Sequence, residues 1–302
     1  MIKSQKSINL IALLALALLW SSSFPAIKIA VGATGPISLV AIRGAIGVLV
    51  VMLFIAVQRE FSWRPYLSYL PYIFLLSIIG MSIPFYLISR AELVIESSLT
   101  GLLMSVGPLM TIVGAHYSLA NERLSLPRVI GVLTGFSGVL LLLGKGAATA
   151  SFATIEAQIM VVVATACYTI GNLMARRMPE VPSLFITFVM LVFLVLQMLP
   201  LALLIESPDP SSWSGSVWAA ALWLGLFPTG IAFSIRFYLI KHAGAGFTSY
   251  VGYLIPVFSL VLGAVILQEA LSAEKIAAVI LVIAGLAISQ RAKSPAINKD
   301  SI

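Results

Sequence analysis

The sequence predicts an all-α membrane protein with ten transmembrane helices, arranged as two inverted five-helix repeats. The first observation is composition: 60% of the 302 residues are hydrophobic, 10% are charged, and the mean hydropathy is +1.08. A soluble domain carries about 25% charged residues, so a water-soluble fold is excluded. The second is that about ten apolar stretches each approach the roughly 20 residues that a helix needs to cross a bilayer. The third is that the pattern of these stretches occurs twice.

The apolar stretches are continuous runs rich in Leu, Ala, Ile and Val, whereas the strands of a membrane barrel alternate apolar and polar residues. Helices are therefore expected. The first stretch follows Lys3 and Lys6, as in a signal peptide, but it continues into a run of serines without a clear small-residue cleavage site, so we expect it to be retained. The ten expected helices cover residues 8–28, 37–57, 69–89, 97–118, 127–144, 155–175, 183–205, 215–236, 246–267 and 274–289.

Matching residues recur about 148 positions apart, which indicates that one membrane unit has been duplicated. We expect a first repeat over residues 1–148 with helices 1–5, and a second over residues 149–302 with helices 6–10 and a short cytoplasmic tail. Because each repeat has an odd number of helices, the two are inverted in the membrane. Inverted repeats are the usual construction of secondary transporters, which open a midplane site to each side in turn. The matched pairs are Trp20 with Tyr168, Lys28 with Arg176, Pro108 with Pro256, Glu122 with Glu269, and Gly138 with Gly285.

Basic residues are distributed unequally between the two sets of connections. The set that contains the N-terminus has thirteen: Lys3, Lys6, Arg59, Arg64, Arg123, Arg128, Arg176, Arg177, Arg236, Lys241, Arg291, Lys293 and Lys299. The opposite set has four: Lys28, Arg90, Lys145 and Lys275. By the positive-inside rule both termini are expected to be cytoplasmic, in the inner membrane of a bacterium. The net charge of +7 follows from this asymmetry, so a nucleic-acid partner is not expected; the expected partners are a small-molecule substrate and the lipid bilayer, and the protein is expected to be a monomer.

Several short motifs, taken in order, resemble the drug/metabolite transporter superfamily of the EamA type, including the YddG-like amino acid exporters. They are Trp20-Ser21-Ser22-Ser23-Phe24-Pro25 with Lys28, Arg43, Gly107-Pro108, Glu122-Arg123-Leu124-Ser125, Leu254-Ile255-Pro256-Val257 and Glu269-Ala270-Leu271-Ser272. The resemblance implies a basket in which helices 1, 3, 4, 6, 8 and 9 surround a central cavity while helices 5 and 10 are peripheral. It also implies export of small metabolites, with amino acids, including aromatic ones, a recurring substrate class.

Polar and aromatic residues on these helices are the candidates for substrate binding. The motif at Trp20 begins about twelve residues into helix 1, near the midplane, and Tyr168 and Asn172 occupy the equivalent depth of helix 6. Packing between helices through small residues is the alternative for the serines. An apolar cavity with a few hydroxyl groups suits an amphipathic or aromatic solute. The expected binding residues are Trp20, Ser22, Phe24, Phe85, Tyr86, Tyr168, Asn172, Phe233 and Tyr253.

Arg43 is a charge inside the second apolar stretch, about seven residues from its start. A charged side chain there costs several kcal/mol unless it reaches the interface or finds a partner, so Arg43 is a functional candidate. Two interpretations remain open: the side chain extends to the outer interface, or it pairs with Glu92 or Glu96, which are expected on the same side.

Prolines interrupt several of the expected helices and are candidate hinges. Pro25 frees the carbonyl of Ser21, and Pro108 and Pro256 stand at matched positions of helices 4 and 9. Proline is also common in membrane helices generally, which is the alternative. Glu122 and Glu269 each follow a helix, and we expect them to help start the next one, with Ser125 or Ser272 as the cap.

A membrane enzyme is the competing class of function. The sequence has neither HExxH nor GxSxG nor a phosphate-binding glycine loop, so no catalytic residue and no cofactor is expected. His116 and His242 are isolated, and no metal site is expected. A channel, a multidrug carrier and a nucleoside carrier remain alternatives. Coupling is also open: the acidic residues lie near helix ends rather than at the midplane, which leaves facilitated diffusion or exchange as a hypothesis.

Overall fold

A computed structural model of the protein describes residues 2–57, 63–118, 125–147, 151–178 and 181–290, and within these ranges the elements are helical, with no strand. Helical segments occupy every apolar stretch that the sequence predicts. Seven of them are long and apolar enough to cross a membrane: Gln5–Thr34, Pro36–Val57, Arg64–Ala91, Ser97–Gly114, Phe152–Ala175, Ser183–Glu206 and Gly215–Ile240. Two shorter apolar helices cover Leu126–Leu142 and Val251–Leu267. The chain is therefore a multi-pass membrane protein.

The first half of the chain consists of α1 (Ile2–Ser21), α2 (Ser23–Thr34), α3 (Pro36–Val57), a 3-10 turn (Arg64–Tyr69), α4 (Leu70–Ser77), a π-helical turn (Ile78–Ser82), α5 (Ile83–Ala91), α6 (Ser97–Met104), α7 (Gly107–Ser118) and α8 (Leu126–Ala147). The second half consists of α9 (Phe152–Ala175), α10 (Ser183–Leu201), a π-helical turn (Ala202–Glu206), a 3-10 turn (Pro210–Ser212), α11 (Gly215–Leu224), a π-helical turn (Gly225–Ile231), α12 (Ala232–Thr248), α13 (Val251–Leu267) and α14 (Ala273–Gln290).

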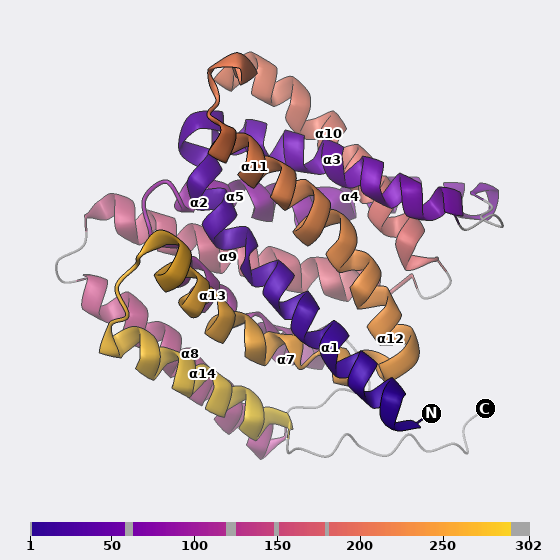
Figure 1. Cartoon of the computed structure of the whole chain (residues 1–302). Helices are drawn as coiled ribbons and strands as arrows, with labels where there is room; N and C mark the ends of the chain where they lie inside the picture. Colours follow the sequence, from indigo (N-terminus) through magenta and orange to yellow (C-terminus); the bar gives the residue numbers. More distant parts are fainter. Residues whose placement is uncertain (1, 58–62, 119–124, 148–150, 179–180, 291–302) are drawn as a thin grey trace.

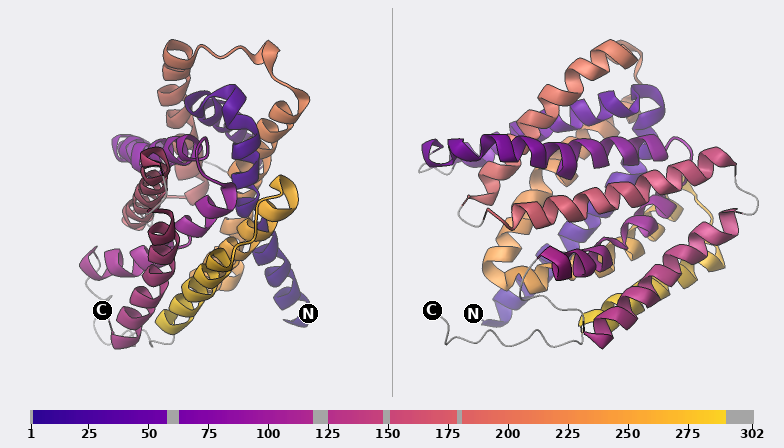
Figure 2. Two further views of the ribbon diagram at one scale, coloured as in Figure 1. Left: turned by 90° about the vertical axis from the view of Figure 1, so that its left-hand side faces the viewer. Right: turned by 180° about the vertical axis from the view of Figure 1, so that it is seen from behind.

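The start of α1 and the end of α14 lie at the same end of the bundle (Figures 1 and 2). In the views of both figures α8 and α14 run side by side at one edge, outside the other helices. Glycines allow their close approach, because a Cβ on Gly285 would come within 2.5 Å of the carbonyl oxygen of Gly131. This peripheral pair agrees with the arrangement that the family resemblance implies for helices 5 and 10.

The first transmembrane stretch bends at Ser22, between α1 and α2. Pro25 has no N–H to give to the carbonyl of Ser21, so the backbone ladder is interrupted there. The Ser22 hydroxyl donates to the carbonyl of Leu19 at 2.8 Å, and the Ser23 hydroxyl donates to the carbonyl of Trp20. The boundary between α1 and α2 thus lies within the serine-proline motif.

Two π-helical turns interrupt the third and eighth stretches, Ile78–Ser82 just before Pro84 and Gly225–Ile231 around Pro228. Gln197 of α10 stabilises the first turn from both sides. Its side-chain oxygen accepts from the Ser82 hydroxyl at 2.6 Å, and its amide nitrogen donates to the Ser77 hydroxyl at 2.9 Å. The turn is followed directly by α5, which carries Phe85.

The prolines of the fourth and ninth stretches behave differently. The fourth stretch breaks at Ser105 and Val106, between α6 and α7, just before Pro108. The expected interruption at Pro256 is wrong, because α13 continues through this residue. The carbonyl of Ile255 accepts hydroxyls from Ser259 at 2.8 Å and from Ser21 of α1 at 3.3 Å. The amide missing at Pro256 leaves the carbonyl of Gly252 without its usual helix partner, and α13 nevertheless continues.

Candidate functional site

Arg43 of α3 is the centre of the candidate site, because it is a buried charge in the membrane interior. Only 4% of its surface is exposed. Its Nη2 donates to the hydroxyl of Thr229 at 3.1 Å, and its guanidinium carbon lies 4.0 Å from the centroid of the Phe85 ring. Arg43 forms no ion pair with a carboxylate in the described part of the chain. A buried guanidinium with one hydroxyl and one aromatic face retains donors for an anion.

Arg43 forms no close ion pair with either predicted partner, although the charge of Glu92 acts on it. Glu96 pairs with Lys275 instead, and the carboxylate of Glu92 accepts no hydrogen bond from a described residue. The alternative, extension to the interface, is wrong, because Thr229 lies in the π-helical turn of a neighbouring helix and is itself 0% exposed. The side chain of Arg43 therefore points into the bundle.

The position of Arg43 is determined by the start of α3. Glu206, at the end of the π-helical turn after α10, accepts the backbone N–H groups of Ile37 at 3.0 Å and Ser38 at 2.7 Å. A carboxylate at a helix N-terminus satisfies unpaired amides and favours the helix dipole. Gly35 precedes the helix with φ of 81°, and a Cβ there would come within 2.4 Å of the Glu206 carboxylate, so glycine is required.

The ring of Phe85 contacts the guanidinium and is itself part of an edge-to-face aromatic pair. Phe85 of α5 meets Tyr168 of α9 edge to face, with centroids 6.3 Å apart. Trp20 of α1 meets Phe233 of α12 in the same manner at 6.5 Å. Phe85 and Phe233 belong to the same hydrophobic cluster, to which Tyr168 also contributes. We name Arg43, Phe85, Tyr168, Thr229, Phe233 and Trp20 the Arg43 site; its residues come from five transmembrane stretches in both halves of the chain.

Two further predicted residues lie close to helix α1 but make other contacts. Ser22 accepts the indole N–H of Trp223 at 2.9 Å, so its hydroxyl joins α1 to α11. Phe24 is 5% exposed and packs against α6, where a Cβ on Gly101 would come within 3.0 Å of its ring. Both residues are buried at helix contacts.

The remaining predicted binding residues are dispersed. Tyr86, adjacent to Phe85, packs with Ile37, Ala41 and Ala202. Asn172 is exposed on α9. The structure therefore does not bring Tyr86 and Asn172 together with the Arg43 site, although they lie on the expected helices.

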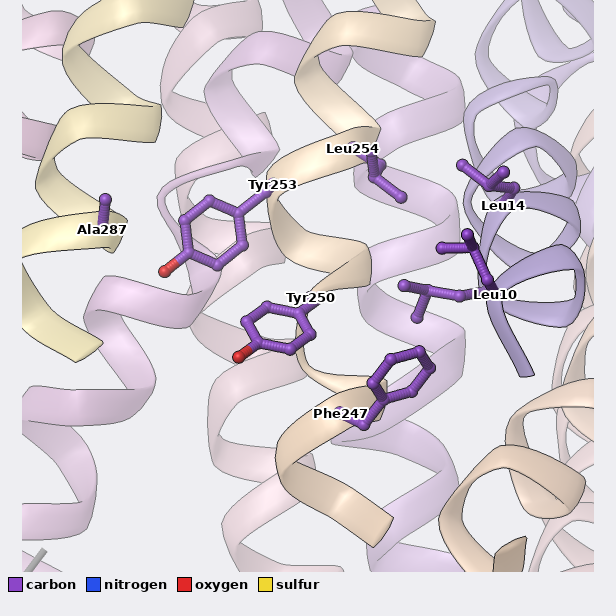
Figure 3. Close-up of a pocket in the computed structure, with 8 residues that line it drawn as sticks. Leu10, Leu14, Phe247, Tyr250, Tyr253, Leu254 and Ala287 are labelled. Carbon is purple, nitrogen blue, oxygen red and sulfur yellow. The ribbon is translucent and has the colours of Figure 1, made fainter. Parts of the chain in front are cut away.

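Tyr253 lines a different pocket, of about 590 Å³, between α1, α13 and α14 (Figure 3). In Figure 3 the hydroxyls of Tyr250 and Tyr253 point away from Leu10 and Leu14 of α1. The Tyr253 hydroxyl is buried without a hydrogen-bond partner among the described residues. Leu10 is 52% exposed and Tyr250 45% exposed, so the pocket opens on the surface of the bundle. It is lined by Leu10, Leu13, Leu14, Phe247, Tyr250, Tyr253, Leu254 and Ala287.

Sequence reasoning did not find Thr229 or Trp223, because a single hydroxyl or indole in an apolar stretch has no distinctive local signal. It also assigned Glu269 to the wrong helix. Glu269 accepts the N–H groups of Ser97 at 2.7 Å and Ser98 at 2.9 Å, so it caps α6 rather than α14. Ser272 does cap α14, accepting the N–H of Lys275 at 3.3 Å.

The matched features of the first half give less information. Glu122 lies outside the described residues. The hydroxyl of Ser125 is buried and has no partner in the described chain, so the expected cap of α8 is wrong. Among the described residues, His, Cys, Asp and Glu side chains form no group of three or more that could hold a metal ion.

Comparisons with known proteins agree on one family. The model of the EamA-like transporter family matches residues 7–144 and again residues 156–290. An uncharacterized transporter of Archaeoglobus fulgidus is 25% identical over 90% of this chain and 95% of its own length. The uncharacterized transporter YoaV of Bacillus subtilis is 21% identical over 92% and 94%. The aromatic amino acid exporter YddG of Ancylobacter novellus is 28% identical over 63% and 65%. A crystal structure with 25% identity matches with a TM-score of 0.65, covering 94% of this chain and 98% of that one.

Proposed function

Because this chain belongs to the EamA-like transporter family, we propose that it is a secondary transporter that exports amino acids with large apolar or aromatic side chains. The single observation that carries the substrate class is Arg43, a 4% exposed guanidinium with no carboxylate partner in the described chain and an aromatic ring against its face. Substrate binds there by its carboxylate.

The free donors of Arg43 favour a carboxylate ligand. A guanidinium presents five N–H donors in a planar fork that matches a carboxylate in two parallel hydrogen bonds. Thr229 accepts from two of the nitrogens, at 3.1 and 3.3 Å, and the ring of Phe85 covers one face. The remaining donors need an acceptor, since a buried charge that lacks one is costly. A substrate carboxylate is an acceptor that arrives and leaves with each transport cycle.

The aromatic residues favour an apolar or aromatic side chain on the substrate. The pair of Phe85 with Tyr168 and the pair of Trp20 with Phe233 supply ring faces and edges against which another ring can pack edge to face. An aromatic amino acid exporter among the relatives, at 28% identity, supports the same class.

We propose alternating access between two inverted repeats as the transport mechanism. The family model matches the chain twice, over residues 7–144 and 156–290, which supports repeats with a boundary near residues 148 and 149. Ten transmembrane helices place both ends of the chain on one side, and the excess of Lys and Arg there makes that side cytoplasmic. The ends of α5 and α13 and the start of α6 then face outwards. The protein functions as a monomer in the inner membrane of a bacterium.

Counterflow in proteoliposomes tests the proposal. Liposomes are loaded with one unlabelled amino acid at a time, and uptake of the same labelled amino acid from outside is followed, with empty liposomes as the control. We expect saturable counterflow with phenylalanine, tryptophan, tyrosine and leucine and little with glutamate or lysine. Counterflow limited to nucleosides or cationic drugs would refute the substrate class, and non-saturable flux without counterflow would indicate a channel.

A variant pair links the flux to the site. Arg43→Gln removes the buried charge, whereas Arg90→Gln removes an exposed charge at the end of α5. We expect Arg43→Gln to lose most of the counterflow at low substrate concentration and Arg90→Gln to keep it. Equal loss in the two variants would contradict the assignment of the carboxylate to Arg43.

A further inference from the structure

Five charged side chains meet beside the middle of α2, where α5 and α13 end and α6 and α14 begin, away from the start of α1. We name them the outer-end cluster: Lys28, Glu92, Glu96, Glu269 and Lys275. They join both halves of the chain. Lys275 of α14 pairs with Glu96, which precedes α6, and Glu269, which follows α13, caps α6. Any separation of the two halves at this end breaks these contacts.

Four members of the cluster have bonded partners. Lys28 donates to the backbone carbonyls of Glu92 at 2.6 Å and Ile95 at 2.9 Å. Lys275 also donates to the Ser98 hydroxyl and the Ala270 carbonyl, both at 3.0 Å. Both ammonium groups therefore have other acceptors than the Glu92 carboxylate.

Glu92 is the exception. It is 0% exposed, and neither carboxylate oxygen has a hydrogen-bond partner among the described residues. The charged groups that face it are Lys28 of α2, Arg43 of α3 and Glu269 after α13. Arg90, two residues earlier on its own helix, is exposed. An ionised carboxylate without a hydrogen bond in such surroundings is unstable by several kcal/mol.

These surroundings favour the neutral carboxyl group. Burial raises the pKa of Glu92 well above its usual value, and the negative charge of Glu269 adds to the rise. The positive charges of Lys28 and Arg43 oppose it but do not cancel it. Complete burial without a hydrogen-bond partner among the described residues thus disfavours the ionised carboxylate while the outer ends are packed together.

We propose that Glu92 is a proton-binding site that controls the outer opening of the transporter, an inference that rests on the proposed alternating access. Its carboxyl is protonated while the outer ends are packed as in this structure. When the ends separate, water reaches the group, the O–H bond breaks, the proton passes to water on the outer side and a solvated carboxylate remains. Because opening releases a proton, external acid favours the closed outer end and external alkali favours the open one.

Thiol accessibility tests this proposal without a substrate. Cys167 is the only cysteine, so Cys167→Ser provides a background in which Ser97→Cys is the reporter. Ser97 is 0% exposed, and cysteine differs from serine only in the replacement of the hydroxyl oxygen by sulfur. Ser212→Cys, exposed between α10 and α11, is the matched control for the pH dependence of the labelling reaction itself.

The Ser97→Cys reporter is labelled with a membrane-impermeant maleimide in proteoliposomes. The labelling rate of the reporter is divided by the labelling rate of the Ser212→Cys control. We expect this ratio to rise with external pH, by at most about tenfold per pH unit for the release of one proton. Adding Glu92→Gln, a permanently neutral group, should hold the ratio low at every pH. A ratio independent of pH in the parent, or an unchanged pH dependence with Glu92→Gln, would overturn the proposal.

A second measurement needs no variant. Because the folded state holds a proton at pH values where the unfolded state has lost it, the Tm of the wild-type protein should fall as the pH rises from about 4.5 towards the raised pKa. A Tm that does not fall above pH 5 overturns the proposal even if Glu92→Gln fails to fold. If counterflow fails but the labelling ratio still depends on pH, the proposed transport function is rejected while the proton-binding site at Glu92 stands.

Discussion

Replacement of Arg43 by Gln is the most informative perturbation of the candidate site. The observed contacts are the hydroxyl of Thr229 at 3.1 Å and the ring of Phe85 at 4.0 Å. Gln keeps a hydrogen-bond donor for Thr229 but loses the positive charge and the planar fork. The main loss is therefore in binding of a substrate carboxylate rather than in helix packing.

The size of the effect follows from the bond that is lost. A hydrogen bond to a charged group contributes about 1.5–3 kcal/mol, and about 1.4 kcal/mol corresponds to a factor of ten, so the apparent affinity should fall roughly 10- to 150-fold. Removal of an unpaired buried charge relieves its desolvation cost, so thermal stability in detergent should not fall.

The assay compares two competitors of labelled phenylalanine counterflow: unlabelled phenylalanine and phenethylamine, which lacks the carboxylate. Wild-type protein should prefer phenylalanine strongly. Arg43→Gln should weaken inhibition by phenylalanine roughly 10- to 150-fold while changing inhibition by phenethylamine little, which removes the preference. If the variant weakens both competitors equally, Arg43 has a structural role and the reasoning is refuted.

Three further predictions concern the surroundings of the site. Trp20→Ala should reduce counterflow of aromatic amino acids by removing an edge-to-face contact worth about 0.5–1.5 kcal/mol. Adding Phe233→Ala to this variant should reduce counterflow little further, because the contact between the two rings is already lost. If the effects of the two substitutions add in full, the two rings act separately. Glu269→Gln should lower stability at pH 7 by about 1 kcal/mol, because hydrogen bonds from Ser97 and Ser98 outweigh burial and hold the pKa of this carboxylate below its usual value. The stability that the ionised carboxylate contributes is present above the pKa of the unfolded state and is lost as the pH falls through the pKa of the folded state. The Tm difference between this variant and the wild type should therefore shrink at acid pH, with exposed Glu156→Gln as the control. Gly285→Leu should cost about 1–3 kcal/mol by forcing α14 away from the Gly131 carbonyl, whereas Gly32→Leu, which meets nothing within 4 Å, should leave the Tm nearly unchanged; an equal effect would contradict close packing of α8 on α14.

The helical stretches and their bends could be predicted from the sequence because they depend on local chemistry. Long apolar runs specify helices in a membrane, and the bend at Ser22 follows from a proline three residues later. Pro256 shows where local reasoning fails. It lies in the interior of α13, which continues from Val251 to Leu267 although the carbonyl of Gly252 loses its usual helix partner.

Partners across the bundle could not be predicted, since they depend on how helices pack. Burial of Arg43 was a sound expectation, but its contact with Thr229 joins residues 186 positions apart. Glu269 likewise caps a helix that begins 172 positions earlier rather than the one that follows it. Phe85 and Tyr86 are adjacent in the sequence but pack in different hydrophobic clusters, because neighbouring residues lie on different faces of a helix.

A structure of the protein with bound phenylalanine would test the central claim most directly. The account predicts that the carboxylate of the ligand lies within hydrogen-bond distance of the Arg43 guanidinium and that its ring lies among Trp20, Phe85, Tyr168 and Phe233. A ligand bound only in the surface pocket at Tyr250 and Tyr253, with Arg43 still bonded to Thr229 and free of any carboxylate, would contradict it.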